Sequence, residues 1–147
     1  MTKMYNFTNE QEFNKWLSNI PSVTQNLFNR FPDSLKTKLT NNDFEALLEI
    51  SEWVLQNVKS IEELKKNPEL WNEVSCYIGE VSRKILNGKW TIELENEDYV
   101  FFKSPTIETS IPSPICPMNL VTALLSRQNS SFIPKIIEKK LERQKVL

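Results

Sequence analysis

Carboxylates are the side chains best placed to carry out acid–base chemistry in this chain, because the sequence contains no histidine. Histidine is the usual general base near neutral pH, so its absence excludes Ser-His-Asp and Cys-His mechanisms and leaves carboxylate, lysine or tyrosine chemistry for an enzyme. One acidic run has spacing that suits paired carboxylates: Glu93, Glu95, Glu97 and Asp98. Acids gathered around an exposed turn more often form a charged edge that discourages aggregation, and we expect that role here.

Other reactive groups are sparse. The two cysteines, Cys76 and Cys116, lie 40 residues apart and are expected to be free thiols. Two glycines are too few to build a glycine-rich phosphate loop, and no metal-ligand cluster is apparent. We therefore expect no catalytic residue, no cofactor and no metal, and the enzyme alternative is a carboxylate-dependent hydrolase or transferase.

A second set of acids lies on a segment with helical spacing of apolar residues from Asp43 to about Val58. Glu45, Glu49 and Glu52 occupy the face opposite its apolar side. That face would suit docking to a basic partner, but an exposed polar helix face is the commoner origin of such a pattern. We expect an exposed polar helix face here. The candidate partner contacts are nevertheless the acids of both sets: Glu45, Glu49, Glu52, Glu93, Glu95, Glu97 and Asp98.

The charges are segregated along the chain although the net charge is only −1. Residues 43–80 hold nine acids and three bases, and residues 127–147 hold six bases and two acids. Nucleic-acid binding is not expected, because the bases are mixed with acids and only Phe132 interleaves them with an aromatic ring. The apolar runs are too short to span a membrane and the first residues do not resemble a secretory signal, so we expect a cytoplasmic location.

The fold class expected is α+β, a helix-rich single domain over residues 1–147, with a central buried helix, an antiparallel β-hairpin and C-terminal helices. Capping signals predict short helices after Thr8, Ser22 and Ser60, with a connection at 32–42 and a cap at Asn41 or Asn42. The central helix is predicted between an Asn67 cap and Asn87, with Pro68 in its first turn. Trp71 and Tyr77 lie on its broad apolar side and are expected in the core.

Both glycines belong to this central region, and each is expected to have a geometric role. Gly79 forms a strip of small residues with Ser75 and Ser82, which predicts close approach of another element. Gly88 is expected to end the helix in the left-handed conformation. Glu80 is expected to form an ion pair with Arg83 or Lys84.

The hairpin is predicted from alternation over residues 90–95, a turn at 96–98 and a second strand at Tyr99 to Lys103. Trp90 is expected to face the central helix. The proline-rich segment 104–117 is expected to be an ordered loop packed by Ile107, Ile111 and Ile115; peptide recognition or strand addition at the sheet edge is the alternative.

Two further helices complete the predicted fold. Asn119 is expected to cap the first of them, and Ser130 or Ser131 is expected to begin the last. The basic end of the last helix, residues 135–147, is expected to fray.

A motif in the central region resembles one found in small, mostly uncharacterised bacterial proteins. It runs from Tyr77 through Gly79-Glu80-Val81 to Arg83, Leu86, Gly88 and Trp90, and the likeness covers residues 35–128. Some proteins of this kind are regarded as toxin immunity proteins, which implies a cytoplasmic inhibitor that binds one partner and has no catalytic residues. Asn87 stands where such proteins often have a second glycine, so a different turn is expected here.

Together these features favour a non-catalytic protein-binding domain with a protein partner, in its most concrete form a toxin-neutralising immunity protein. A carboxylate-dependent enzyme and a structural or regulatory homodimer are the alternatives. Neither a nucleic-acid partner nor a membrane partner is expected.

Overall fold

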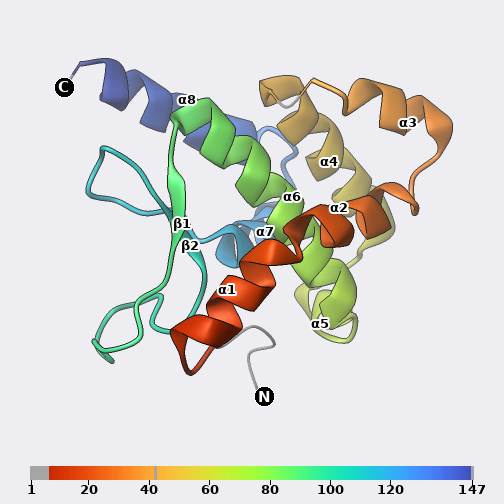
Figure 1. Ribbon diagram of the computed structural model, residues 1–147. Helices are drawn as coiled ribbons and strands as arrows, with labels where there is room; N and C mark the ends of the chain where they lie inside the picture. The colour runs from red at the N-terminus through yellow and green to blue at the C-terminus, as the bar shows by residue number, and fades with distance from the viewer. Residues whose placement is uncertain (1–6, 42, 147) are drawn as a thin grey trace.

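The computed structural model describes residues 7–41 and 43–146, which form the helices and strands drawn in Figure 1. In chain order these are α1 Glu10–Ser18, α2 Ile20–Phe28, α3 Asp33–Lys38, α4 Phe44–Asn57, α5 Ile61–Lys65, α6 Pro68–Leu86, β1 Lys89–Thr91, β2 Thr106–Glu108, α7 Pro117–Arg127 and α8 Phe132–Lys145. The expected helix-rich α+β single domain is confirmed. None of the described helices has the combination of length and apolar character that crossing a membrane requires.

Helix α6 is the centre of the fold, as predicted. The Asn67 side chain caps it by accepting a hydrogen bond from the backbone N–H of Leu70 at 3.3 Å, and Pro68 occupies its first turn. Every residue from Leu70 to Gly79 is buried, so the helix is covered all round along this stretch. Helices α2, α4, α5, α7 and α8 all pack against it. This single helix therefore organises the hydrophobic core.

Two aromatic side chains of α6 fix its neighbours through polar atoms. The indole N–H of Trp71 donates a hydrogen bond to the carbonyl of Met118 at the start of α7, at 3.1 Å. The hydroxyl of Tyr77 donates to the carbonyl of Leu39 at 3.4 Å, and burial raises the pKa of that hydroxyl. Both rings are almost fully buried, so these bonds add orientation to a large apolar contact.

The close approach expected at Gly79 is confirmed. The indole ring of Trp90, from β1, occupies the position of a Cβ on residue 79, and the side chain of Pro117 lies 3.1 Å from it. Trp90 thus faces the central helix, as predicted, and a side chain at position 79 would displace it.

The left-handed residue at the end of α6 is Asn87 (φ 53°), so the expectation for Gly88 was wrong. Asparagine tolerates this conformation better than most residues. Gly88 has a different role: a Cβ there would lie 2.8 Å from the backbone oxygen of Glu108. The missing side chain lets β2 approach the end of the helix.

Strand β1 pairs antiparallel with β2, and Trp90 lies opposite Ile107. Strand β1 ends at Thr91, so the predicted strand over residues 90–95 was too long. The prediction of a second strand at Tyr99–Lys103 was wrong, because these residues form successive turns, with Phe102 N–H bonded to the Tyr99 carbonyl at 3.0 Å. The segment that pairs with β1 is Thr106–Glu108, which places the fully buried Ile107 beside Trp90. Burial in tertiary contacts has outweighed the strand propensity of the aromatic segment.

The segment 104–117 packs against the body of the protein, as predicted, but it is not one loop, because it contains β2 and the first residue of α7. We call its loop residues 109–116 the proline loop. Ile107, Ile111 and Ile115 are all buried. Ile107 and Ile115 exchange two backbone hydrogen bonds, of 2.7 and 3.0 Å. These bonds occupy the outer edge of β2 at Ile107. Peptide recognition or strand addition at the sheet edge stays a prediction.

Several helix boundaries differ from the prediction because a neighbouring residue makes the cap. Asn9, not Thr8, caps α1, and Asp43, not Asn41, caps α4; Asn42 lies outside the described residues.

Proline in the first turn determines where two other helices begin: α2 begins before Ser22 and α7 begins before Asn119. The Ser60 cap is confirmed, and the predicted connection at 32–42 contains the short helix α3.

Helix α8 follows Ser131, as predicted, and runs through Lys145. Its last turns contact the rest of the protein by hydrogen bonds. Lys140 Nζ donates to the carbonyl of Ser113 at 2.9 Å, and Gln144 donates to the carbonyl of Leu86 at 3.1 Å. The last turns of α8 are thereby joined to the proline loop and to α6.

Candidate functional site

The segment between β1 and β2, residues 92–105, carries the acids that the sequence singled out, and we call it the acidic loop. Its first turn is built around Glu93, whose Oε2 accepts hydrogen bonds from the backbone N–H groups of Glu95 and Asn96, both at 3.1 Å. Those N–H groups lower the pKa of Glu93. The backbone N–H of Lys103 donates to the Glu93 carbonyl at 2.8 Å and closes the loop. Glu93 therefore shapes the loop and stays ionised near neutral pH.

The outer part of the acidic loop combines negative charge with an exposed apolar side chain. Glu95, Glu97 and Asp98 are exposed, and 73% of Val100 is exposed. The rings of Tyr99 and Phe101 pack edge to face, with centroids 5.8 Å apart. The loop thus presents an apolar side chain beside carboxylates on a backbone held by its own contacts.

Lys103 marks the point where the loop turns back toward β2. Its φ of 64° is unusual for a lysine, and its ammonium lies 5.1 Å from the centroid of the Phe102 ring. The backbone N–H of Phe7 donates to its carbonyl at 3.1 Å. These contacts join the acidic loop to the N-terminal part of the described chain.

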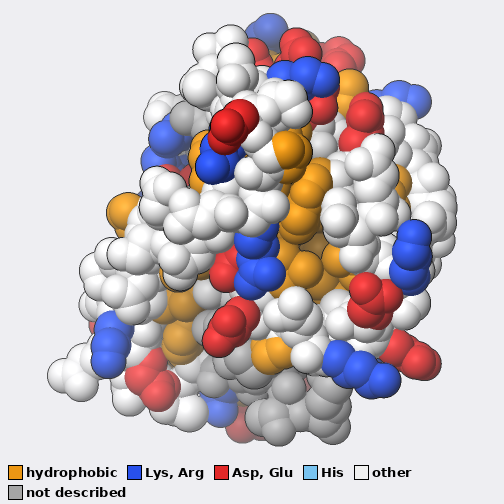
Figure 2. Space-filling model, turned by 90° about the vertical axis from the view of Figure 1, so that its right-hand side faces the viewer, with side chains coloured by type: hydrophobic (Ala, Val, Ile, Leu, Met, Phe, Trp, Pro, Cys, Tyr) orange, Lys and Arg blue, Asp and Glu red, His pale blue; other side chains and the backbone are white. Residues whose placement is uncertain are grey.

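The acids of α4 form a separate surface. Glu45 and Glu52 are exposed, and Glu49 forms an ion pair of 3.8 Å with Lys38. In Figure 1, α4 and the acidic loop lie on opposite sides of α6, so the structure does not bring the two predicted sets of acids together. Figure 2 shows the side of the molecule that carries α2 and α3, where acidic and basic side chains are interspersed around a groove with hydrophobic side chains on its floor.

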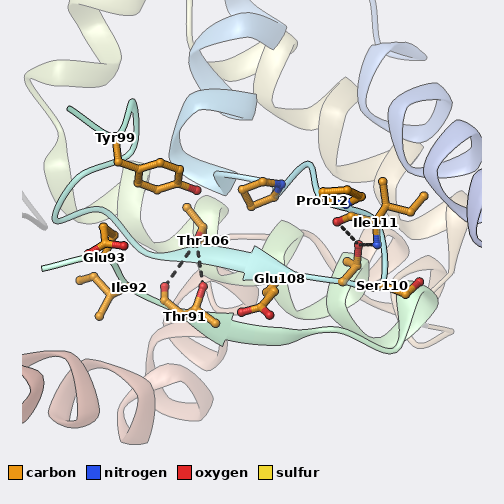
Figure 3. Close-up of a pocket in the computed structure, with 11 residues that line it drawn as sticks. Thr91, Ile92, Glu93, Tyr99, Thr106, Glu108, Ser110, Ile111 and Pro112 are labelled. Atoms are coloured by element: carbon orange, nitrogen blue, oxygen red, sulfur yellow. Dashed lines mark hydrogen bonds between the residues drawn. The ribbon is translucent and has the colours of Figure 1, made fainter. Parts of the chain in front are cut away.

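A cleft of about 480 Å³ lies between the acidic loop and the proline loop (Figure 3). Strand alternation turns Trp90 and Ile107 toward the core and turns Thr91, Thr106 and Glu108 toward the cleft. The complete lining is Thr91, Ile92, Glu93, Tyr99, Thr106, Glu108, Thr109, Ser110, Ile111, Pro112 and Pro114. One face of the small sheet is therefore core and the other is the floor of a site.

Tyr99 forms one end of the cleft, and its ring reaches over Thr106 (Figure 3). The Thr106 and Thr91 hydroxyls are 3.0 Å apart and hydrogen-bonded. Burial raises the pKa of Tyr99, and nearby negative groups, including Glu93 and Glu108, act in the same direction. The tyrosine therefore stays protonated and can donate a hydrogen bond into the cleft.

Sequence reasoning named Glu93 as a candidate contact but missed the other polar groups of the cleft, among them Tyr99, Thr106 and Glu108. Tyr99 was placed in a strand that does not form, and Thr106 and Glu108 were placed in a loop without strand alternation. The polar-apolar-polar alternation of Thr106, Ile107 and Glu108 is the sequence signal for β2. Three residues are too few for such an alternation to predict a strand by itself.

The cleft offers little for acid catalysis. Its two lining acids are Glu93 and Glu108, and the lowered pKa of Glu93 opposes a role as a proton donor. Over residues 7–41 and 43–146, no group of three or more acids, cysteines or histidines is arranged to hold a metal ion. Burial raises the pKa of the Cys76 thiol and makes it a poor nucleophile.

Glu80 takes part in a network at the junction of α6 and β1. Its carboxylate accepts two hydrogen bonds from Arg83, at 2.9 and 3.1 Å, so the expected ion pair is confirmed. It also accepts one from the indole N–H of Trp90 at 2.7 Å. Burial alone would raise the pKa of Glu80, but these hydrogen bonds and the charges of Arg83 and Lys84 hold it below the ordinary value.

Comparisons with protein-family models, with curated proteins and with solved structures found no match to this chain. The resemblance over residues 35–128 to small bacterial proteins, some of which are regarded as immunity proteins, therefore stays a prediction from the sequence. Its most distinctive part is the motif between Tyr77 and Trp90. Its residues lie at the contact of α6 with β1, where Gly79 and Trp90 meet.

Proposed function

We propose that this protein is a non-catalytic protein-binding domain whose acidic loop docks on a partner with a basic surface. In its most concrete form it is an immunity protein that neutralises a toxin in the bacterial cytoplasm. The observation that carries the proposal is Val100, 73% exposed on a loop that also presents Glu95, Glu97 and Asp98. An apolar centre with a charged rim is the usual composition of a specific protein interface.

The two kinds of side chain would contribute differently to binding. Val100 and the neighbouring aromatic rings would lose water-exposed apolar surface on contact, which supplies affinity. The carboxylates would accelerate association with a basic partner and align it, an effect that weakens as salt increases. Because Glu93 already holds the turn by two hydrogen bonds, little ordering of the loop would oppose binding.

The acids on α4 support docking less well. Glu49 is already paired with Lys38, and the ring of Trp53 packs against Phe31 with centroids 4.8 Å apart. Val100 and Val146 are the large hydrophobic side chains that are exposed in the described part of the chain, and neither belongs to α4. The acidic loop is therefore the better candidate interface.

The enzyme alternative receives less support from the site. A carboxylate-dependent hydrolase or transferase needs an acid whose pKa is raised toward neutrality or two carboxylates aimed at one substrate. The Glu93 pKa is shifted the other way, and Glu95, Glu97 and Asp98 do not line the cleft.

Site-specific photo-crosslinking in the source cells tests the proposal. A photoreactive amino acid would replace Val100 in one variant and Val146, the matched exposed position at the end of α8, in the other. We expect one protein to be captured from position 100 and not from position 146. Capture of a second copy of this chain would favour the homodimer alternative, and the absence of any product specific to position 100 would contradict the proposal.

The immunity form makes a separate prediction about survival. A strain that lacks this protein should be killed by toxin-secreting sibling cells, and expression of the wild-type chain should restore growth. The Glu95→Lys, Glu97→Lys, Asp98→Lys triple variant should fail to restore it at equal protein level, because its loop would repel a basic toxin. Equal survival of all these strains would contradict the immunity form.

A further inference from the structure

We propose that the cleft beside the acidic loop is a binding site for an organic cation, an ammonium or guanidinium group carried on a short apolar stem. The juxtaposition that points to it is a preformed cleft with carboxylates, hydroxyls and apolar walls at its surface. The volume of about 480 Å³ is in the ordinary range for small-ligand sites. This site would exist whether or not the acidic loop binds a protein.

The charge of the cleft selects for a cation. Glu93 and Glu108 line it, and no lysine or arginine does. Both backbone hydrogen bonds to Glu93 fall on Oε2, which leaves Oε1 able to accept from a ligand. Glu108 is exposed at the other end of the floor. Lys89 lies opposite it in the strand register and lines the second cleft, and no ion pair between the two is formed. The cleft therefore offers a cation one carboxylate at each end of its floor, and no base lines it.

The other walls fit an apolar stem and a polar head. Ile111, Pro112 and Pro114 supply apolar surface at the end formed by the proline loop. Tyr99 contributes a ring face, which attracts cations, and a hydroxyl at the opposite end. Thr91 and Thr106 are already hydrogen-bonded to each other, so their oxygens can accept further bonds from an N–H donor.

The cleft does not need to be ordered by its ligand. The two backbone bonds between Ile107 and Ile115 fix one wall, and Lys140 fixes the proline loop by donating to the carbonyl of Ser113. The Thr109 hydroxyl accepts from the backbone N–H of Ile111 at 3.2 Å. A preformed site loses less conformational entropy on binding.

A second cleft, of about 390 Å³, provides an internal contrast. It is lined by Arg83, Lys89 and Glu80, and Glu80 is already bonded to Arg83 and Trp90. Bases outnumber acids there, so an organic cation should prefer the cleft beside the acidic loop.

The same head group occurs in free amines and in lysine or arginine side chains of a protein. Titration of the isotope-labelled protein with cadaverine and with agmatine, followed by amide NMR shifts, tests the shared chemistry. We expect saturable shifts for Thr91, Thr106 and Glu108, and weaker shifts with 1-pentanol, which has the stem but no charge. A blocked tripeptide with a central lysine distinguishes the sources, since tighter binding of the tripeptide than of cadaverine indicates a protein side chain and the reverse indicates a free amine.

The Glu108→Gln variant isolates the charge of the cleft. It should bind cadaverine about two- to fivefold more weakly, because an ion pair with an exposed carboxylate is lost. The matched Glu97→Gln variant removes an equal charge from the acidic loop outside the cleft and should bind like the wild type. Both residues are exposed, so folding should be unaffected. The proposal would be overturned by absent cleft shifts at about 10 mM amine, by equal shifts with pentanol, or by equal effects of the two variants.

Discussion

Gly79 lies directly beneath the indole ring of Trp90, and this contact joins the central helix to the sheet. Trp90 is held from three directions: by Gly79 below, by the Glu80 carboxylate on its N–H, and by the ring of Trp16, whose centroid is 5.0 Å away. The motif around Gly79 therefore describes a packing junction. Its residues position the strand that precedes the acidic loop.

Replacement of Gly79 should destabilise the protein by displacing Trp90. The Gly79→Ala variant should lose about 1–3 kcal/mol of unfolding free energy through overpacking, despite the higher helix propensity of alanine, and Gly79→Leu should lose more. Chemical denaturation measures both. An unchanged unfolding free energy in Gly79→Leu would contradict this account of the contact.

Ser82 provides the control on the same helix. It is fully buried, and its Oγ is the one buried side-chain oxygen or nitrogen without a hydrogen-bond partner among the described residues. The Ser82→Ala variant should therefore be as stable as the wild type or more stable, because an unsatisfied polar atom is removed and helix propensity improves.

The low pKa of Glu80 predicts a pH-dependent contribution to stability. Because the pKa is lower in the folded than in the unfolded protein, the ionised carboxylate stabilises the fold above the unfolded pKa of about 4.3. That stabilisation is lost as the pH falls through the folded pKa. The difference in melting temperature between wild type and Glu80→Gln should thus be largest near pH 7 and should shrink in acid. A constant difference would contradict it, and Glu97→Gln is the exposed control.

At the scale of elements, local signals were predictive and long-range pairing was not. Asn67-Pro68 and the breadth of the apolar side located α6, because caps and periodicity act within one helix. The partner of β1 depends on which distant segment can bury Ile107 beside Trp90, which the aromatic run at Tyr99–Lys103 does not reveal. The same dependence hid the cleft, since Thr106 and Glu108 meet Thr91 only through that pairing.

Helix α1 is attached to the protein through a small separate cluster. Phe13 and Trp16 of α1 pack with Ile20 of α2 and Cys76 of α6, in a cluster separate from the main core that surrounds α6. Trp16 adds one buried hydrogen bond, from its indole N–H to the Asn72 side chain at 3.0 Å.

We therefore expect α1 to open before the main core. Backbone amides of α1 should exchange with deuterium well before those at the centre of α6. The Trp16→Ala variant should accelerate exchange in α1 much more than in α4, which packs on α6 and α8 in the main core. Hydrogen exchange followed by mass spectrometry measures this order, and equal protection of α1 and α6 would contradict it.

At the scale of the whole molecule, the acidic loop and the cleft share one side of the sheet, and the core-facing side is closed by α6. The acids of α4 lie across α6 from this region. In the part of the chain that the structure describes, negative charge, an exposed apolar side chain and a cleft therefore occur together in this region. Its acidic residues could be predicted from the sequence, whereas its cleft forms only through the pairing of β1 with β2.

Quantitative co-purification from the source cells tests the central claim most directly. The wild type is compared with a loop variant, Glu95→Lys, Glu97→Lys, Asp98→Lys, and with a helix variant, Glu45→Lys, Glu52→Lys. We predict a basic protein that is recovered with the wild type and the helix variant and is depleted at least about tenfold with the loop variant. Failure to find any protein whose recovery depends on the acidic loop would contradict the proposed function.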